Sequence, residues 1–164
     1  MRGTGLFINW ESGNKNSKLK AHLFGSGTIL NEVIKAQKVL EEKFNVSADV
    51  WSVTSYKELY MDGISAERVN MLNPEKEQLK PYITSVLEKE TGVFIAASDY
   101  IKALPAMIEK WIPGDFNILG TDGFGRSDGR KQLREFFEVD HRYIVIATLN
   151  SLVKEKKFKS CEVD

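Results

Sequence analysis

The stretch from Asn117 to Arg130, NILGTDGFGRSDGR, gathers the residues of this chain best suited to chemistry. Three glycines fall within six residues, and charged side chains lie between and after them. Arg126 and Arg130 could grip a carboxylate or a phosphate, because guanidinium groups form paired hydrogen bonds with both. Asp122 and Asp128 could instead pair with these arginines within the loop. The residue types leave two interpretations open: a site for a small anionic ligand, or a loop that is satisfied internally or buried at a domain interface.

Further polar side chains fall where predicted strands end. Thr54 and Asp99 each follow an apolar run, and the loop Gly25-Ser26-Gly27-Thr28 follows another. The carboxyl ends of parallel strands meet at one edge of a sheet, where α/β proteins place their sites. We therefore expect one loop or interface surface, made of Ser26, Thr28, Thr54, Asp99, Asp122, Arg126, Asp128 and Arg130.

Neither glycine-rich loop completes a nucleotide-binding motif. The loop at 25–28 precedes a predicted helix, whose free N–H groups attract anions. It lacks the third glycine of GxGxxG, because position 30 is leucine, and it lacks the lysine of a P-loop. The loop at 120–125 reads GTDGFG. The sequence favours a tight strand-to-helix turn at 25–28 over dinucleotide binding.

One spacing resembles the GDG…N motif that holds magnesium and diphosphate in thiamine diphosphate enzymes. Asp122 and Gly123 are followed by Asn150, but the leading residue is Thr121 rather than glycine. Asn150 also falls in the middle of a predicted helix, whereas the ligands of a hard cation must converge on one point. We therefore predict no metal site from this motif.

The remaining candidates for chemistry are isolated. His22 and His141 have no cysteine or second histidine at metal-ligand spacing, so each is expected to be a hydrogen-bonded or exposed histidine. Ser26 and Ser127 lack the G-x-S-x-G setting of a nucleophile elbow. No catalytic, cofactor-binding or metal-binding residue is predicted.

The alternation of predicted strands and helices along the chain shows which elements these loops connect. Apolar runs predict strands at 20–24, 48–53, 93–97 and 116–119, with a possible edge strand at 5–10 and an exposed loop at 11–18. Helical spacing predicts a long helix over 29–44, capped by Ser26 or Thr28 and closed by Asn45. Strand, helix and strand in this order indicate a right-handed parallel crossover.

The later helices are less regular. We predict a helical turn at 56–63, a short helix at 65–72 capped by Ser65, and a helix from Pro81 to about residue 90. Pro105 falls inside a helical pattern, so a turn at 99–104 and a helix starting near Pro105 are expected. Residues 130–137 predict a helix. The segment 141–157 fits a strand or a helix, and its length and Asp140 as cap favour a helix.

Composition indicates one globular domain. The chain has 164 residues, 42% of them hydrophobic, and 23 basic residues balance 23 acidic ones. A neutral chain is not expected to bind nucleic acid or an anionic membrane surface. No apolar run approaches the roughly 20 residues of a membrane span, and no signal peptide is seen. The single cysteine, Cys161, cannot form an internal disulfide, which fits a frayed tail in a reducing cytoplasm.

Several strings occur in an order and spacing typical of one enzyme family. The most specific are DVWSVTS (49–55) and GTDGFGRSD (120–128), and others are LFGSGTIL (23–30), ERVNMLNPE (67–75) and FFEVDHRYIVIATL (136–149). On these strings the sequence resembles the C-terminal domain of homodimeric, bacterial-type pyruvate dehydrogenase, the thiamine diphosphate-dependent first component of the pyruvate dehydrogenase complex. It departs from the family pattern at Val69, Asn73 and Gly129, where the family often has Trp, His, and Ser or Thr.

The resemblance implies a transketolase-like C-terminal domain. Such a domain is a three-layer α/β/α fold around a mostly parallel five-stranded sheet with one antiparallel edge strand. We expect it to span residues 19–164, with residues 1–18 as an N-terminal extension that holds the possible edge strand.

The resemblance also implies where the chemistry lies. In this family thiamine diphosphate and magnesium are held by the N-terminal and middle domains. The parent enzyme decarboxylates pyruvate oxidatively and transfers the acetyl group to a lipoyl group on the acetyltransferase component. The implied partners of this chain are therefore the catalytic domains, a second copy in a homodimer, and the lipoyl-bearing component. A free-standing anion-binding module and a regulatory or scaffold role are the alternatives.

Overall fold

A five-stranded sheet forms the middle layer of the fold. The computed structural model describes residues 7–14 and 17–155. The strands are β1 (Phe7–Trp10), β2 (Lys20–Gly25), β3 (Ser47–Val53), β4 (Val93–Ala97) and β5 (Phe116–Leu119). They lie in the order β1-β3-β2-β4-β5. The strands β3, β2, β4 and β5 pair in parallel, and β1 pairs with β3 in the antiparallel direction.

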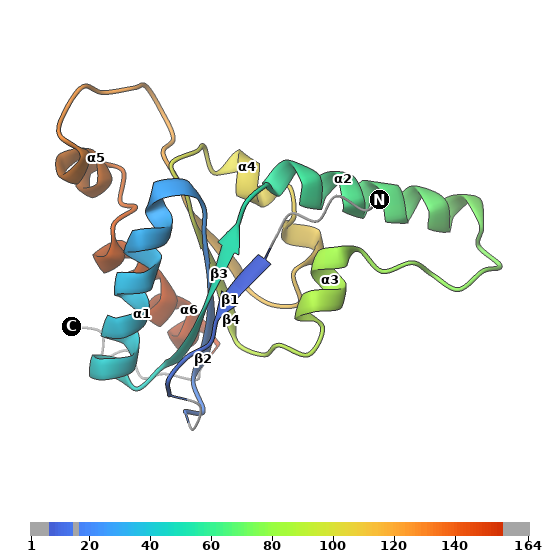
Figure 1. Cartoon of the computed structure of the whole chain (residues 1–164), viewed down its shortest axis with the longest axis horizontal. Coiled ribbons are helices and arrows are strands. Elements are labelled where there is room, and N and C mark those ends of the chain that lie inside the picture. The colour runs from blue at the N-terminus through green and yellow to red at the C-terminus, as the bar shows by residue number, and fades with distance from the viewer. Residues whose placement is uncertain (1–6, 15–16, 156–164) are drawn as a thin grey trace.

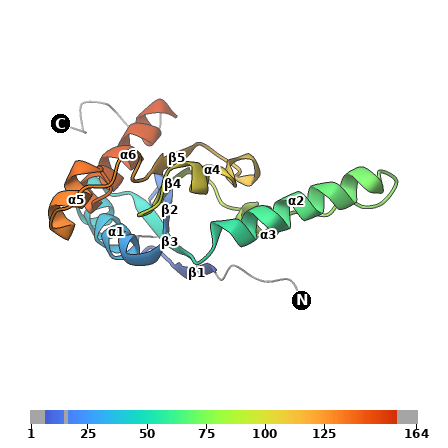
Figure 2. The ribbon, with the colours of Figure 1, turned by 90° about the horizontal axis from the view of Figure 1, so that it is seen from above.

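Helices cover both faces of this sheet. Along the chain they are the 3-10 turn η1 (Gly27–Ile29), α1 (Leu30–Phe44), α2 (Tyr56–Leu72), α3 (Tyr82–Leu87), α4 (Ala103–Ala106), the 3-10 turn η2 (Glu109–Trp111), α5 (Arg130–Phe136) and α6 (His141–Lys154). Helices α1, α5 and α6 lie on one side and α2, α3 and α4 on the other, as the two views show (Figures 1 and 2). The predicted three-layer α/β/α architecture with a parallel sheet is confirmed. Among the described residues, no helix is long and apolar enough to cross a bilayer.

Each face of the sheet carries its own core. Alternate strand residues point to α1 and α6 on one side, as Leu23 and Ile95 do, or to α2 and α3 on the other, as Phe24 and Phe94 do. All five residues of β4 are buried because both of its faces are covered, which explains why the strand reads as a continuous apolar run. Among the described residues, the buried Phe, Trp and Tyr side chains all lie in the second core: Phe24, Trp51, Tyr56, Phe94, Trp111 and Phe116.

The structure corrects the prediction of two helical pieces at 56–72. Helix α2 is continuous, and its N-cap is Ser55, whose hydroxyl accepts the backbone N–H of Glu58 at 3.2 Å. Gly63 lies inside this helix, where an added Cβ would come within 2.4 Å of the ring of Trp111. The glycine therefore allows helix–helix packing and does not mark a break. The outer part of α2 extends well away from the sheet (Figure 2).

Three further expectations differ from the structure. Helix α1 begins after a 3-10 turn, so neither Ser26 nor Thr28 caps it through its side chain. No long helix starts at Pro105, which instead lies within the short helix α4. In the predicted exposed loop at 11–18, two serines are buried. Ser12 donates a hydrogen bond to the Glu41 carboxylate, and Ser17 donates one to the backbone oxygen of Asn45.

Two helix ends agree with the sequence. Asn45 closes α1 in the left-handed conformation, with φ of 52°. Asp140 caps α6 by accepting the backbone N–H groups of Arg142 and Tyr143, so the segment from 141 to 154 is a helix. Residues 156 and 157 of the predicted helix and Cys161 lie outside the described residues.

Candidate functional site

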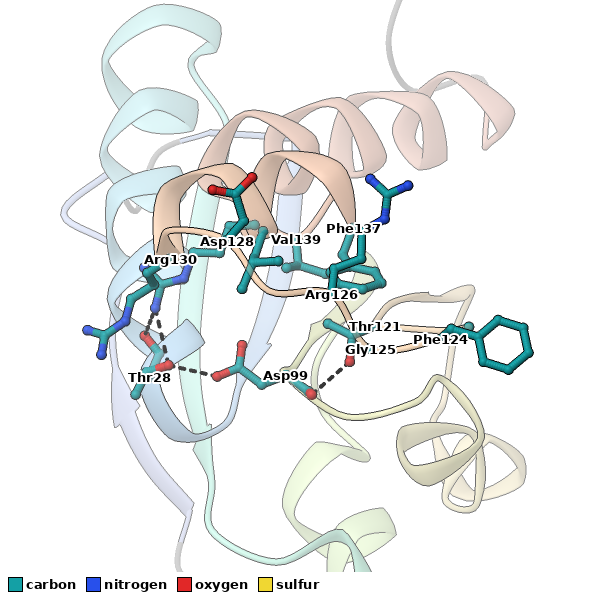
Figure 3. Close-up of a pocket in the computed structure, with 13 residues that line it drawn as sticks. Thr28, Asp99, Thr121, Phe124, Gly125, Arg126, Asp128, Arg130, Phe137 and Val139 are labelled. Carbon is teal, nitrogen blue, oxygen red and sulfur yellow. Dashed lines mark hydrogen bonds between the residues drawn. The ribbon is translucent and has the colours of Figure 1, made fainter.

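A cavity of about 520 Å³ opens at the carboxyl edge of the sheet. The loop at 120–130 forms one wall, helix α5 another, and Thr28 and Asp99 form the floor near the strand ends (Figure 3). Leu133, Phe137 and Val139 add apolar surface. The volume falls in the range of small-ligand pockets, about 300–1,000 Å³.

Hydrogen bonds tie three strand-end loops together at this edge. The hydroxyl of Thr28 donates to the Asp99 carboxylate at 2.7 Å, and the hydroxyl of Thr121 donates to the Asp99 backbone oxygen at 2.7 Å. Arg134 of α5 reaches the Thr28 hydroxyl at 3.1 Å. The loops after β2, β4 and β5 are thereby joined, as expected where parallel strands end.

The first half of the 120–130 loop is bound to the segment that follows β4. The Asp122 carboxylate accepts the backbone N–H of Lys102 at 2.9 Å, and the Lys102 ammonium lies 3.8 Å from its other oxygen. The backbone N–H of Thr121 donates to the oxygen of Tyr100 at 2.9 Å. Asp122 therefore does not pair with Arg126 or Arg130, as the residue types allowed, and its carboxylate instead binds the neighbouring loop at Lys102.

The second half of the loop is exposed. Gly123 has φ of 100°, a conformation that favours glycine, and the following Phe124 is 97% exposed and points away from the cavity (Figure 3). Arg126 lies over the ring of Phe136, 3.8 Å from its centroid. Asp128 accepts the backbone N–H of Gly129 at 2.7 Å and pairs with no arginine among the described residues.

The structure thus gathers five of the eight predicted residues. Thr28, Asp99, Arg126, Asp128 and Arg130 line the cavity. The other three do not: Ser26, Thr54 and Asp122.

Each of the three has a structural reason to lie elsewhere. Ser26 is buried, and its hydroxyl has no hydrogen-bond partner among the described residues. Thr54 follows β3, from which the chain continues into α2 on the opposite face of the sheet. Asp122 is turned toward Lys102.

The sequence missed Glu32, a buried carboxylate beside the cavity. It lies on α1 and is only 4% exposed. Its oxygens lie 2.8 Å from the Lys35 ammonium, 3.0 Å from the Arg134 guanidinium and 3.1 Å from His141 Nδ1. Burial would raise the pKa of Glu32, but the hydrogen bonds from Lys35 and His141 outweigh it and lower the pKa to about 2. Only Lys35, at i+3, is a signal that the local sequence contains.

This network decides which cations of the cavity remain for a ligand. Arg134 is already paired with Glu32, so its role is structural. Arg126 and Arg130 have no carboxylate partner within the described part of the chain. One guanidinium group on the loop and one at the start of α5, both without a carboxylate partner, can meet an anionic ligand or an acidic surface.

Comparison with known families decides what kind of domain this is. Residues 5–140 match the family model described as the Transketolase-like TK C-terminal domain. The chain belongs to this family.

Close sequence relatives of this transketolase-like C-terminal domain are pyruvate dehydrogenase E1 components. The chain is 46% identical to that of Pseudomonas aeruginosa over 143 residues, which cover 87% of this chain and 16% of the relative. It is 45% identical to that of Escherichia coli K12, over 85% of this chain and 16% of the relative. For Mycolicibacterium smegmatis the identity is 37%, over 92% and 16%. The chain therefore spans about a sixth of the length of these relatives.

Solved structures share the fold at low identity. A split-gene transketolase, described as an inactive beta4 tetramer, superposes with a TM-score of 0.61 at 16% identity, over 91% of this chain and 43% of that chain. Transketolase from Leishmania mexicana gives 0.56 at 14% identity, over 89% and 18%. These matches show the transketolase C-terminal fold.

The transketolase-like C-terminal domain does not bring a GDG…N-like cation site together. The carboxylate of Asp122 is bonded to Lys102, and Asn150 is an exposed residue within α6. Neither residue lines the cavity at the carboxyl edge. Asp122 and Asn150 therefore do not fit a shared magnesium-diphosphate site.

Proposed function

We propose that this chain is the C-terminal, non-catalytic assembly domain of a pyruvate dehydrogenase E1-type enzyme. One observation carries the proposal. The relatives match nearly the whole of this chain, at 46% identity for the first and 37% for a more distant one, yet only 16% of their own length is matched. The match is the size of one domain, so the rest of the relatives' machinery corresponds to other domains.

In the proposed enzyme the chemistry lies outside this chain. Thiamine diphosphate and magnesium belong to the N-terminal and middle domains, which decarboxylate pyruvate oxidatively and pass the acetyl group to the lipoyl-bearing acetyltransferase component. This domain packs on those catalytic domains and helps to build the homodimer, in the cytoplasm. Residues 19–164 form the domain in this proposal, and residues 1–18 are an extension that contributes β1 to the sheet.

The surface supports an assembly role. Phe124 is 97% exposed, and Tyr100 and Ile101, on the loop to which residues 121 and 122 are bonded, are more than half exposed. Met71 and Leu72, at the outer end of α2, are 70% and 61% exposed. Large apolar side chains grouped on a surface are typical of interaction sites.

A chimeric enzyme tests the proposal. The matching segment of the Pseudomonas aeruginosa E1 component is replaced by this chain, and the quaternary structure and pyruvate turnover of the chimera are measured with thiamine diphosphate and magnesium. We expect a dimeric, active enzyme. In calorimetry, this chain alone is expected to bind no thiamine diphosphate. Micromolar, magnesium-dependent binding by the isolated chain, or a folded chimera that fails to dimerise, would contradict the proposal.

A second candidate function rests on the cavity itself. Arg126 and Arg130 line a space of about 520 Å³ without carboxylate partners among the described residues, which suits a small phosphate or carboxylate ligand. A thermal-shift screen of phosphates, nucleotides and carboxylates tests this function. A hit that is lost in Arg130→Ala and kept in Lys38→Ala, an exposed cation on α1, supports it, and a flat screen counts against it.

A further inference from the structure

The chain has three Asp-Gly dipeptides, a sequence in which aspartate readily rearranges to isoaspartate. They are Asp62-Gly63, Asp122-Gly123 and Asp128-Gly129. The rearrangement requires the backbone nitrogen of the glycine to reach the carboxyl carbon of the aspartate, and a residue without a Cβ leaves this approach open. The three dipeptides are identical in sequence, so their folded surroundings decide which of them reacts.

The carboxylate of Asp128 lies against the backbone nitrogen that would attack it. Its Oδ1 accepts the N–H of Gly129 at 2.7 Å, and no other hydrogen bond holds this carboxylate among the described residues. Both residues are exposed. Gly129 is the N-cap of α5, with φ of −63° and ψ of 149°, so its N–H has no acceptor within the helix. The reacting groups are therefore close together and not held elsewhere.

The other two dipeptides are held in unreactive arrangements. Asp122 accepts the backbone N–H of Lys102 at 2.9 Å, and its second oxygen lies 3.8 Å from the Lys102 ammonium. Asp62 accepts the backbone N–H of Tyr82 at 2.6 Å, and Gly63 is buried within α2. A helical N–H is directed to the carbonyl four residues before it, so the nitrogen of Gly63 cannot turn to the Asp62 side chain.

We propose that Asp128-Gly129 is a site of spontaneous covalent modification, at which the folded chain forms isoaspartate. The nitrogen of Gly129 attacks Cγ of the protonated Asp128 carboxyl group. A C–N bond forms, the C–O bond breaks, and the amide proton and the hydroxyl group leave together as water. One water molecule then opens the five-membered imide. Hydrolysis at the former main-chain carbonyl gives isoaspartate, and hydrolysis at Cγ restores aspartate.

The modification alters the start of α5. The backbone oxygen of Gly129 accepts the N–H of Leu133 at 3.0 Å, which is a hydrogen bond of the first helical turn. Isoaspartate lengthens the main chain before Gly129 by one methylene group and moves the carboxylate of residue 128 onto Cα. Since Asp128, Arg130 and Leu133 all line the cavity at the carboxyl edge, the modification changes both its charge arrangement and one of its walls.

Ageing of the full chain tests the site. The chain is kept at pH 6 and 37 °C for several weeks, and isoaspartate is located by electron-transfer fragmentation of its proteolytic peptides. We expect residue 128 to accumulate isoaspartate about tenfold or more faster than residues 62 and 122, because only its reacting groups are held together. In guanidinium chloride the three sites should react at comparable rates, since the fold no longer distinguishes them.

Two glycine variants provide a matched pair. Gly129→Ala should slow the modification about tenfold, because its methyl group obstructs the attacking nitrogen. This variant should fold, since the backbone conformation suits alanine and the nearest atom to an added Cβ is the end of the flexible Gln132 side chain. Gly125→Ala, in the same loop and with no atom within 4 Å of the added Cβ, should leave the rate unchanged.

Hydrogen exchange gives a readout of the modified protein. In the isoaspartate form, separated by ion-exchange chromatography, the amide of Leu133 should exchange faster than in the unmodified chain. Equal accumulation at residues 122 and 128 of the folded chain, or none at residue 128, would overturn the proposal. An equal preference for residue 128 in guanidinium chloride would also overturn it, because the fold would then not select the site. These outcomes are independent of the proposed assembly function.

Discussion

Glu32 on α1 and Arg134 on α5 form an ion pair with nitrogen and oxygen 3.0 Å apart, although 102 residues separate them. The same carboxylate accepts the backbone N–H of His141 at 3.2 Å, at the start of α6. One buried side chain therefore joins the three helices on this side of the sheet. It also fixes α5, which forms a wall of the cavity.

Removing the negative charge of Glu32 should destabilise the fold. Glu32→Gln leaves Arg134 without its partner in a position where its side chain is only 16% exposed, and breaking a buried ion pair costs about 3 kcal/mol. The free energy of unfolding is measured by urea titration at pH 7. Glu42→Gln, an exposed residue of the same helix, should change it by less than about 0.5 kcal/mol. Equal stability of the two variants would show that the network contributes nothing.

The same residue should set part of the acid sensitivity. The pKa of Glu32 is lowered from 4.5 to about 2 in the folded protein, so the unfolded chain binds its proton first as the pH falls. The stabilisation is present in full above pH 4.5 and is lost as the pH falls toward 2, with a total on the order of 3 kcal/mol. Unfolding measured from pH 6 to pH 3 should show a shallower slope in Glu32→Gln than in the unchanged chain. Parallel slopes would contradict the assignment.

The close contact between α2 and Trp111 predicts a third effect. A methyl group in Gly63→Ala would lie 2.4 Å from the indole ring, so the helix or the ring must shift. Overpacking of this kind costs about 2 kcal/mol, which outweighs the gain of about 1 kcal/mol in helix propensity. Gly125→Ala, where no atom lies within 4 Å, is the control for the same substitution. A more stable Gly63→Ala protein would mean that α2 does not pack on Trp111.

The sequence predicted the sheet better than the helices, for a physical reason. The strand 93–97 reads as a short apolar run with its true bounds, because burial on both faces leaves no other pattern. The edge strand 116–119 was also predicted with its true bounds. Gly63 instead reads as a helix breaker, since the ring that requires a glycine there comes from the distant Trp111. Local patterns do not contain such contacts.

The residues of the candidate site also divide into those that the sequence could predict and those that depend on distant contacts. The meeting of Thr28, Asp99 and the 120–130 loop followed from parallel topology, because all three follow neighbouring strands. Thr54 was expected with them but follows β3, whose next helix lies on the other face. Glu32 depends on Arg134 and His141, which come from far along the chain, so no spacing rule could have found its network.

Phe124 should drive self-association of the chain. It is 97% exposed at the tip of the loop, beside a surface that the proposed enzyme covers with another domain, so two chains can bury it against each other. Sedimentation velocity at increasing concentration should show dimers or larger species, and Phe124→Ser should weaken this association at least tenfold. The melting temperature of Phe124→Ser should equal that of the unchanged chain, because a fully exposed ring contributes no buried surface. Ile146→Ser, a half-exposed residue on α6, is the control and should associate like the unchanged chain. A strictly monomeric protein at millimolar concentration would contradict self-association. Loss of association in Ile146→Ser but not in Phe124→Ser would place the association surface on α6 instead.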